Sequence, residues 1–217
     1  MLKQTQILLK HLLLNEWRQL YAVMALLLQV VSSIFVLYLA AKFLDKPTWN
    51  AVYWVLLLFL SVNAVGRSFI QEPKGRLMYY YQLCSPSSII ISRIIYNTLI
   101  TLFIALLSLF LYSVWMGNPV EKMGLYTMVI CLAAIGYSSV LTLMSAISSH
   151  SGNSYIIMPV LSFPVIIPLL NLSVHAAKQA MDGIDSSLIY QNIIYLGCLD
   201  LIIFGMAYIL FPYLWKD

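Results

Sequence analysis

The stretch IIISRIIYNTLITLFIALLSLFLYSVW, residues 89–115, decides the fold, because it is almost entirely apolar and carries a single charge at Arg93. A helix needs about 20 mostly apolar residues to cross a hydrocarbon core of about 30 Å. This stretch is long enough to do so, and the chain contains five others of the same kind. The six predicted spans are residues 21–41, 49–65, 89–115, 125–147, 155–174 and 193–213.

The composition of the whole chain agrees with this interpretation. Of its 217 residues, 62% are hydrophobic and 9% are charged, whereas soluble domains contain about 25% charged residues. A soluble fold is therefore excluded. Because the apolar runs are continuous rather than alternating, helices are favoured over a barrel. We expect an all-α integral membrane protein, in which residues 1–217 form a single transmembrane domain with a six-helix bundle.

The distribution of basic residues predicts the orientation, because Lys and Arg accumulate on the cytoplasmic side. One side would hold Lys3, Lys10, Arg18, Arg67, Lys74, Arg76, Arg93 and Lys216, and the other Lys42, Lys46, Lys122 and Lys178. We therefore expect both termini and residues 66–88 to lie in the cytoplasm of a bacterium, with the spans in its inner membrane. The first apolar run starts late and lacks a cleavage pattern, so we expect it to remain as a signal anchor.

Residues 1–20 have the pattern of an amphipathic helix lying on the membrane surface. Apolar residues recur at helical spacing on one face and polar residues occupy another. The apolar face consists of Leu9, Leu13, Trp17 and Leu20, and the polar face of Lys3, Gln6 and Lys10. A simple extension of the first span, with snorkelling basic groups, is the alternative.

The segment GRSFIQEPKGRLMYYYQLCSPSS, residues 66–88, is the longest polar stretch. Pro73 and Gly75 interrupt the helix that leaves the membrane, residues 77–83 can form a short interfacial helix, and Pro86 suits the first turn of the next span. A short cytoplasmic helix between two spans is suited to docking in a groove on a peripheral subunit. The alternative is a solvated turn with tyrosines at the level of the headgroups.

Two spans carry patterns that bear on packing. The fourth has small residues at every fourth position, which allows a neighbouring helix to approach closely; they are Ala134, Ser138, Thr142 and Ala146. The fifth has prolines, each of which removes a backbone donor and bends the helix; they are Pro159, Pro164 and Pro168. We expect the fifth span to be kinked and to be buried in the bundle or at a subunit interface.

Asp200 lies inside the last span, where an ionisable group is costly and indicates a functional site. It could serve transport or gating, or be a structural acid that is hydrogen-bonded to a Tyr, Ser or Asn of a neighbouring helix. His150 and His175 could each ligate a metal or haem iron, but neither has a companion ligand in the sequence. We expect no metal site.

The remaining sequence offers no visible catalytic group. The chain lacks a phosphate-binding Gly-x-x-x-x-Gly-Lys-Ser/Thr loop, a His-Glu-x-x-His motif and a Gly-x-Ser-x-Gly motif. The cysteines are too far apart for a metal knuckle or a disulfide framework, and we expect them to pack as small apolar residues; they are Cys84, Cys131 and Cys198. We therefore expect a non-catalytic membrane subunit that takes any energy it needs from a partner.

Two local patterns carry a resemblance to a known family. After the second span come an acidic residue, a glycine, spaced leucines and a proline, here Glu72, Gly75, Leu77, Leu83 and Pro86. The fifth span contains FPVIIPLL, residues 163–170, after the small polar turn at residues 151–153. In these patterns the chain resembles the cytochrome c maturation haem exporter protein B family, CcmB, of the type-2 ABC exporter permeases. It departs from the family at Met78 and the three tyrosines that follow.

The resemblance implies a permease with the type-2 ABC exporter fold, whose segment 66–88 couples to an ATPase through the five residues of the first pattern. It implies a second copy of the chain, a cytoplasmic ATPase (CcmA), a haem-handling membrane subunit (CcmC), a small helical subunit (CcmD) and a haem chaperone (CcmE) as partners. ATP would bind the ATPase, and haem would be handled by the complex, for haem delivery or release of the loaded chaperone in the periplasm. A permease for a lipid, drug or polysaccharide, a non-transporting scaffold, and an intramembrane enzyme that uses Asp200 or His175 are the alternatives.

Overall fold

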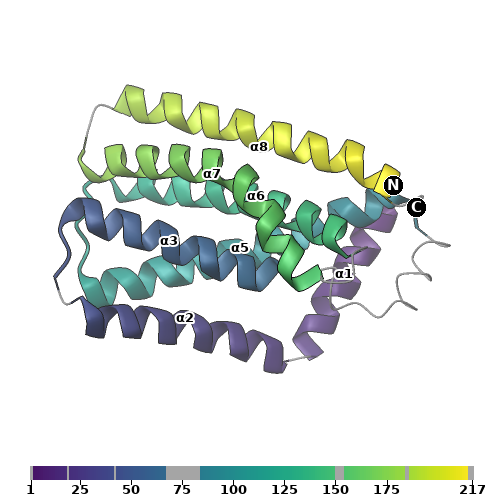
Figure 1. Ribbon diagram of the computed structural model, residues 1–217, viewed down its shortest axis with the longest axis horizontal. Helices are drawn as coiled ribbons and strands as arrows, with labels where there is room; N and C mark the ends of the chain where they lie inside the picture. Colours follow the sequence, from purple (N-terminus) through teal and green to yellow (C-terminus); the bar gives the residue numbers. More distant parts are fainter. Residues whose placement is uncertain are drawn as a thin grey trace.

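The computed structural model describes residues 2–18, 20–41, 43–66, 84–149, 154–183 and 186–214. In this part of the chain every regular element is a helix, which confirms the prediction of an all-α protein (Figure 1). The helices are α1 (Leu2–Arg18), α2 (Leu20–Ala40), α3 (Lys46–Val65), α5 (Pro86–Met116), α6 (Met123–Ser148), α7 (Ser154–Met181) and α8 (Ser186–Leu214).

Five of these helices, α3 and α5 to α8, are long and apolar enough to cross a membrane, and α2 contains the shorter apolar stretch Met24–Ala40. Each predicted span overlaps one of the six helices from α2 to α8. The helices extend beyond several predicted spans, above all at the end of α7 and the start of α8. Polar residues can continue a helix outside the lipid, so apolar length underestimates helix length. The six-span count itself stays a prediction.

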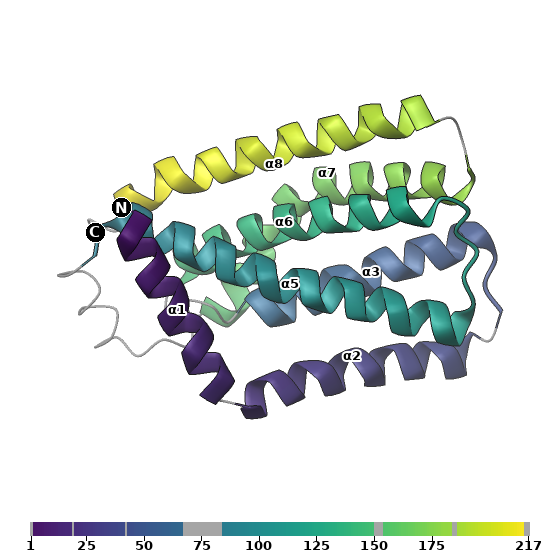
Figure 2. The same cartoon turned by 180° about the vertical axis from the view of Figure 1, so that it is seen from behind.

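The six longer helices lie side by side with their axes roughly aligned, and α6 is in the middle (Figures 1 and 2). It packs against α3, α5, α7 and α8. Of its apolar window 72% is buried, against 22% for α8. α6 is therefore the core helix of the bundle, and α8 has most of its surface free to face lipid or another protein.

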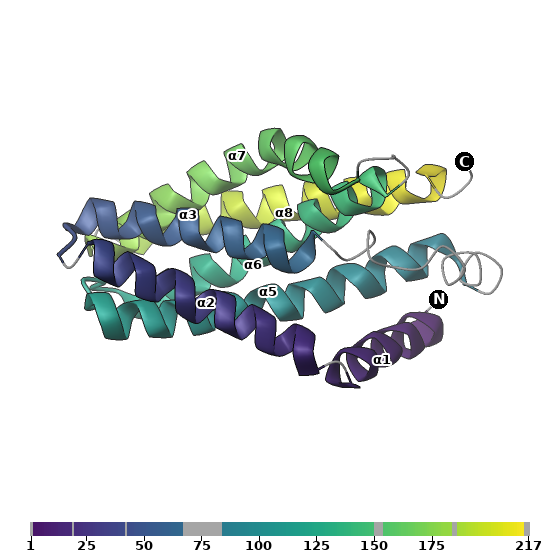
Figure 3. The ribbon, with the colours of Figure 1, turned by 60° about the horizontal axis from the view of Figure 1, so that its bottom comes forward.

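Helix α1 is separate from α2 and is steeply inclined to the bundle, against the start of α5 (Figures 2 and 3). Its Gln6 and Lys10 are exposed, while Leu9 and Leu13 are half-buried. This is the face division expected of an amphipathic helix. The side chains of the other predicted face residues, Lys3, Trp17 and Leu20, lie outside the described residues. Its position at the membrane surface stays a prediction.

Helix α7 is bent, and its first part is inclined to the rest (Figures 1 and 3). All three of its prolines lie inside the helix, where each removes a backbone hydrogen bond and so accounts for bending. Pro164 and Pro168 are exposed, and Pro159 is half-buried. The prediction that this span is buried within the bundle is therefore wrong for that face. The alternative, a subunit interface, stays a prediction.

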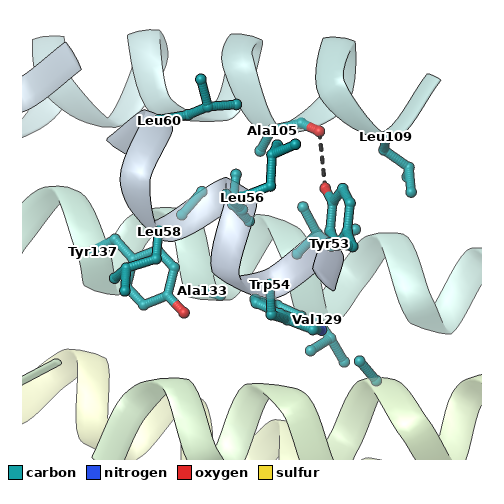
Figure 4. Packing of buried hydrophobic residues seen from close by; sticks show 14 of the residues in the cluster. Tyr53, Trp54, Leu56, Leu58, Leu60, Ala105, Leu109, Val129, Ala133 and Tyr137 are labelled. Carbon is teal, nitrogen blue, oxygen red and sulfur yellow. Dashed lines mark hydrogen bonds between the residues drawn. The ribbon is translucent and has the colours of Figure 1, made fainter. Parts of the chain in front are cut away.

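A buried aromatic cluster occupies the end of the bundle where α3 begins. The rings of Trp49 and Tyr112 have centroids 4.7 Å apart, and Tyr53 donates a hydrogen bond to the carbonyl oxygen of Ala105 at 3.1 Å (Figure 4). Asn50 is the polar centre of the cluster: its side-chain oxygen accepts from Trp54 Nε1 and from the Tyr126 hydroxyl, both at 3.1 Å. In the sequence the tryptophans look scattered, whereas two of them pack in one cluster.

Candidate functional site at the coupling-segment anchors and the intramembrane acid

The residue at which α3 ends, Gly66, is held by two other helices. The hydroxyl of Ser145, on α6, donates a hydrogen bond to the Gly66 carbonyl oxygen at 3.3 Å. A Cβ at Gly66 would lie 3.3 Å from the side chain of Met158, on α7. The end of α3 is therefore in contact with both α6 and α7.

The other end of the same segment is attached to α1. Pro86 is the first residue of α5, as predicted, and the backbone N–H groups of Ser88 and Ile89 donate to the carbonyl oxygen of Ser85 at 3.0 and 3.3 Å. The hydroxyls of Ser85 and Ser88 lie 2.7 Å apart, and both donate to Oε1 of Gln4 at 3.4 and 3.5 Å. The start of α5 and the start of α1 therefore form one polar contact.

The segment between these two anchors, residues 67–83, lies outside the described residues. Four of the predicted ATPase-coupling residues belong to it: Glu72, Gly75, Leu77 and Leu83. The predicted interfacial helix at residues 77–83 belongs to it as well. Their roles stay predictions, as does the role of His150, which also lies outside the described part.

Helices α5 and α6 are joined by a polar seam, which we define as Asn97 and Thr98 of α5 with Ser138 and Thr142 of α6. Asn97 donates to the Thr142 hydroxyl oxygen at 2.7 Å, and the hydroxyls of Thr98 and Ser138 lie 2.6 Å apart. The two α6 residues of this seam belong to the predicted small-residue stripe, and all four residues of that stripe are buried. In an apolar environment such paired hydroxyl and amide groups join helices specifically.

Asp200 lies at the junction of α6, α7 and α8. Only 6% of its surface is exposed, and among the described residues neither carboxylate oxygen has a hydrogen-bond partner. A Cβ at Gly136, on α6, would overlap Asp200 Oδ1 and Leu169 Cδ1. The absent side chain of Gly136 thus provides the space in which the carboxyl group sits. The hydrogen bond to a neighbouring Tyr, Ser or Asn, which was one of the two alternatives, is not found among the described residues.

Tyr137 follows Gly136 and completes this junction. Its hydroxyl is also buried and without a hydrogen-bond partner among the described residues. Neither of these α6 residues was predicted from the sequence. The sequence did offer one signal. Gly136 is a small residue that falls outside the four-residue repeat of small residues in the same span.

The other candidate ligands are dispersed. His175 is exposed on α7, Cys84 and Cys131 are partly buried, and Cys198 is exposed. Within the described ranges, no three His, Cys, Asp or Glu side chains gather in a way that could hold a metal ion.

The long apolar helices, packed around a buried core helix, define a multi-pass α-helical membrane protein. The chain belongs to the CcmB family: a family model described as CcmB protein matches residues 46–210. Membership of this family makes the chain a membrane component of the haem exporter ABC system of cytochrome c biogenesis. The match begins at α3 and includes segment 67–83 and the Asp200 junction. Comparisons with curated proteins and with solved structures give no match.

Proposed function

We propose that this chain couples ATP hydrolysis by a partner ATPase to haem delivery, or to release of a haem-loaded chaperone, on the periplasmic side of the membrane. The ATPase docks on residues 67–83, and its closure displaces that segment. Two copies of the chain form the membrane part, in the inner membrane, with both termini in the cytoplasm.

The observation that supports this mechanism most directly is the pair of anchors at the ends of the segment. At one end, Gly66 is held by Ser145 and lies against Met158; at the other, Ser85 and Ser88 contact Gln4. A push on the segment is therefore divided between α6 and α7 on one side and α1 and α5 on the other. The polar seam joins α5 to α6, so the two routes meet in the core of the bundle.

The proposed partners follow from the family, which belongs to a system with an ATPase and other Ccm subunits. They are a CcmA-like ATPase, CcmC-like and CcmD-like membrane subunits, and a CcmE-like haem chaperone. ATP is bound by the ATPase and haem by the haem-handling subunits. This chain supplies the moving membrane part and no catalytic group.

Tagged purification in mild detergent, with mass spectrometry of the co-purifying proteins and absorbance of bound haem, tests the partners. We expect an ATPase and the haem-handling subunits together. An ATPase without them would instead favour a permease for a lipid, drug or polysaccharide. Recovery of membrane subunits without any ATPase would favour a scaffold.

Replacement of Leu77 by Glu tests the coupling segment itself. We expect the Leu77→Glu variant to insert and to assemble, but to lose cytochrome c maturation while the ATPase continues to hydrolyse ATP. The Leu77→Ile variant, which keeps an apolar side chain of the same size, is the matched control and should mature cytochromes normally. Normal maturation by Leu77→Glu would contradict the mechanism.

A further inference from the structure

Three buried oxygen atoms lack a hydrogen-bond partner among the described residues: the two carboxylate oxygens of Asp200 and the hydroxyl of Tyr137. Elsewhere in the described part, every other buried side-chain nitrogen and oxygen has a partner. Buried polar groups in proteins are normally paired, and an unpaired one requires an explanation such as a bound proton, ion or water. Here the unpaired atoms belong to two residues, Asp200, which packs against Gly136, and Tyr137, which follows Gly136 in the chain.

The junction lies at the middle of the bundle. Asp200 is at the midpoint of α8 (Ser186–Leu214), and Gly136 is near the midpoint of α6 (Met123–Ser148). Helices of this length centred on the membrane would place both residues near its midplane, where no headgroup or bulk water is available. Gly136 brings α6 so close to Asp200 that a single methyl group would overlap the carboxylate.

The helices that pack against α8 are α5, α6 and α7. From α6, Gly136 lies against the carboxyl group, and the residue that follows it is the titratable Tyr137; from α7, the side chain at the junction is the apolar Leu169. Other ionisable groups on these four helices are Arg93, Tyr96, Tyr112, Tyr126, Cys131, Tyr155, His175, Lys178, Tyr190, Tyr195, Cys198, Tyr208 and Tyr213.

None of the cations among these groups donates a hydrogen bond to the carboxylate oxygens of Asp200. Ile94, the neighbour of Arg93, packs in a cluster with Ala207, which lies roughly two helical turns beyond Asp200. His175 and Lys178 are exposed and lie past the junction, toward the end of α7. A carboxylate buried in an apolar core without a cation is so unfavourable that the group takes up a proton instead.

We propose that Asp200 and Tyr137 form a proton-binding site at the centre of the bundle. The carboxyl group holds the proton while α6, α7 and α8 are packed as in this structure. When α8 separates from α6, water enters and the carboxyl O–H transfers its proton to a water molecule, which leaves a hydrated carboxylate and a hydronium ion. Because α8 is peripheral and α7 is bent (Figure 1), the contact between α6 and α8 is the one best placed to open.

Infrared spectroscopy of the full-length chain in lipid tests the proposal, because a protonated carboxyl has a carbonyl stretching band that ionised carboxylates lack. At neutral pH we expect this band in the wild type and its loss in the Asp200→Asn variant, which keeps the shape of the side chain. Identical spectra for the two proteins would overturn the proposal. Transfer to heavy water should shift the band as the proton exchanges, and a band that never shifts would disprove release to water.

The hydroxyl of Tyr137 is tested by Tyr137→Phe, which should change the frequency of the same band. Tyr208→Phe, on the partly exposed face of α8, is the matched control and should leave the band unchanged. An unchanged band in Tyr137→Phe would remove Tyr137 from the site.

A second measurement needs no variant. A hydrophobic carbodiimide reacts with protonated carboxyl groups in membranes, and mass spectrometry then locates the modified residue. We expect Asp200 of the wild type to be modified, and more so at mildly acidic than at alkaline pH. Equal modification at both pH values, or none at Asp200, would overturn the proposal.

Discussion

The aromatic cluster around Asn50 and the junction around Asp200 are both buried polar regions, yet they are built in opposite ways. Asn50 accepts from Trp54 and Tyr126 and donates to the carbonyl oxygen of Val174 at 3.2 Å. The described part of the chain offers Asp200 no such partner. The same membrane bundle thus contains one polar residue that joins three helices and another that leaves its hydrogen-bonding capacity unused.

This difference separates polar groups that stabilise the bundle from polar groups that do not. A paired polar residue inside a membrane holds helices together, whereas an unpaired one costs stability. The Asn50 end is further fixed by loop contacts. Trp49 Nε1 donates to the Gly117 carbonyl oxygen at 3.1 Å, and Lys122 N donates to that of Ala180 at 3.1 Å. The two regions should therefore respond oppositely to substitution.

The largest effect is expected for Asn50→Leu. The substitution leaves the Trp54 N–H and the Tyr126 hydroxyl buried without an acceptor, so we expect the free energy of unfolding to fall by about 2–4 kcal/mol. Denaturation by sodium dodecyl sulfate in mixed micelles, followed by tryptophan fluorescence, measures it. Asn171→Leu, at an exposed position of α7, is the control and should have little effect. Equal effects of the two substitutions would contradict a central role for Asn50.

The second effect concerns the close approach at Gly136. We expect Gly136→Ala to lower the free energy of unfolding by about 1–3 kcal/mol, because the new methyl group overlaps Asp200 and Leu169. Gly197→Ala, on α8, where an added Cβ would meet open space, should be neutral or slightly stabilising. Combining Gly136→Ala with Asp200→Ala should recover part of the loss, since the overlapping carboxylate is then removed. Strict additivity in that double-mutant cycle would show that the two residues do not touch.

The sequence predicted the helical class and the approximate position of each long helix, because continuous apolar runs leave the backbone no other way to satisfy its hydrogen bonds. It also predicted that Asp200 would lie inside a span. It could not predict that Gly136 and Tyr137 lie opposite Asp200, because the pairing of α6 with α8 depends on how all the helices pack. The sequence of α6 alone does not show which residue of another helix will pack against a given position.

The aromatic cluster illustrates the same limit. Trp49 and Tyr53 are four residues apart on α3 and could have been placed on one face from the sequence. Tyr112 and Tyr126 belong to α5 and α6, far apart in sequence, and only tertiary packing brings their rings to Trp49. The prolines of α7 had the opposite outcome: the sequence correctly indicated a bent helix, but burial of that span within the bundle was wrong for the face that carries Pro164 and Pro168.

The third prediction reverses the sign of the first. Asp200→Leu replaces an unpaired buried acid with an apolar side chain of similar size, so we expect the free energy of unfolding to be unchanged or to rise by up to about 2 kcal/mol. The same denaturation experiment measures it, with Asn50→Leu as the reference. A clear destabilisation by Asp200→Leu would mean that the acid has a stabilising partner after all.

The smallest effect is expected from a matched pair of tyrosines on α6. Tyr126 and Tyr137 are both fully buried, but the Tyr126 hydroxyl donates to Asn50 and the Tyr137 hydroxyl has no partner in the described part. We therefore expect Tyr126→Phe to lower the free energy of unfolding by about 1 kcal/mol and Tyr137→Phe to leave it unchanged. Each substitution removes one oxygen atom from the same helix, so burial and propensity are matched and only the hydrogen bond differs. If Tyr137→Phe lowers the free energy of unfolding as much as Tyr126→Phe does, the Tyr137 hydroxyl must be paired. The two regions would then not differ in how their buried polar groups are satisfied.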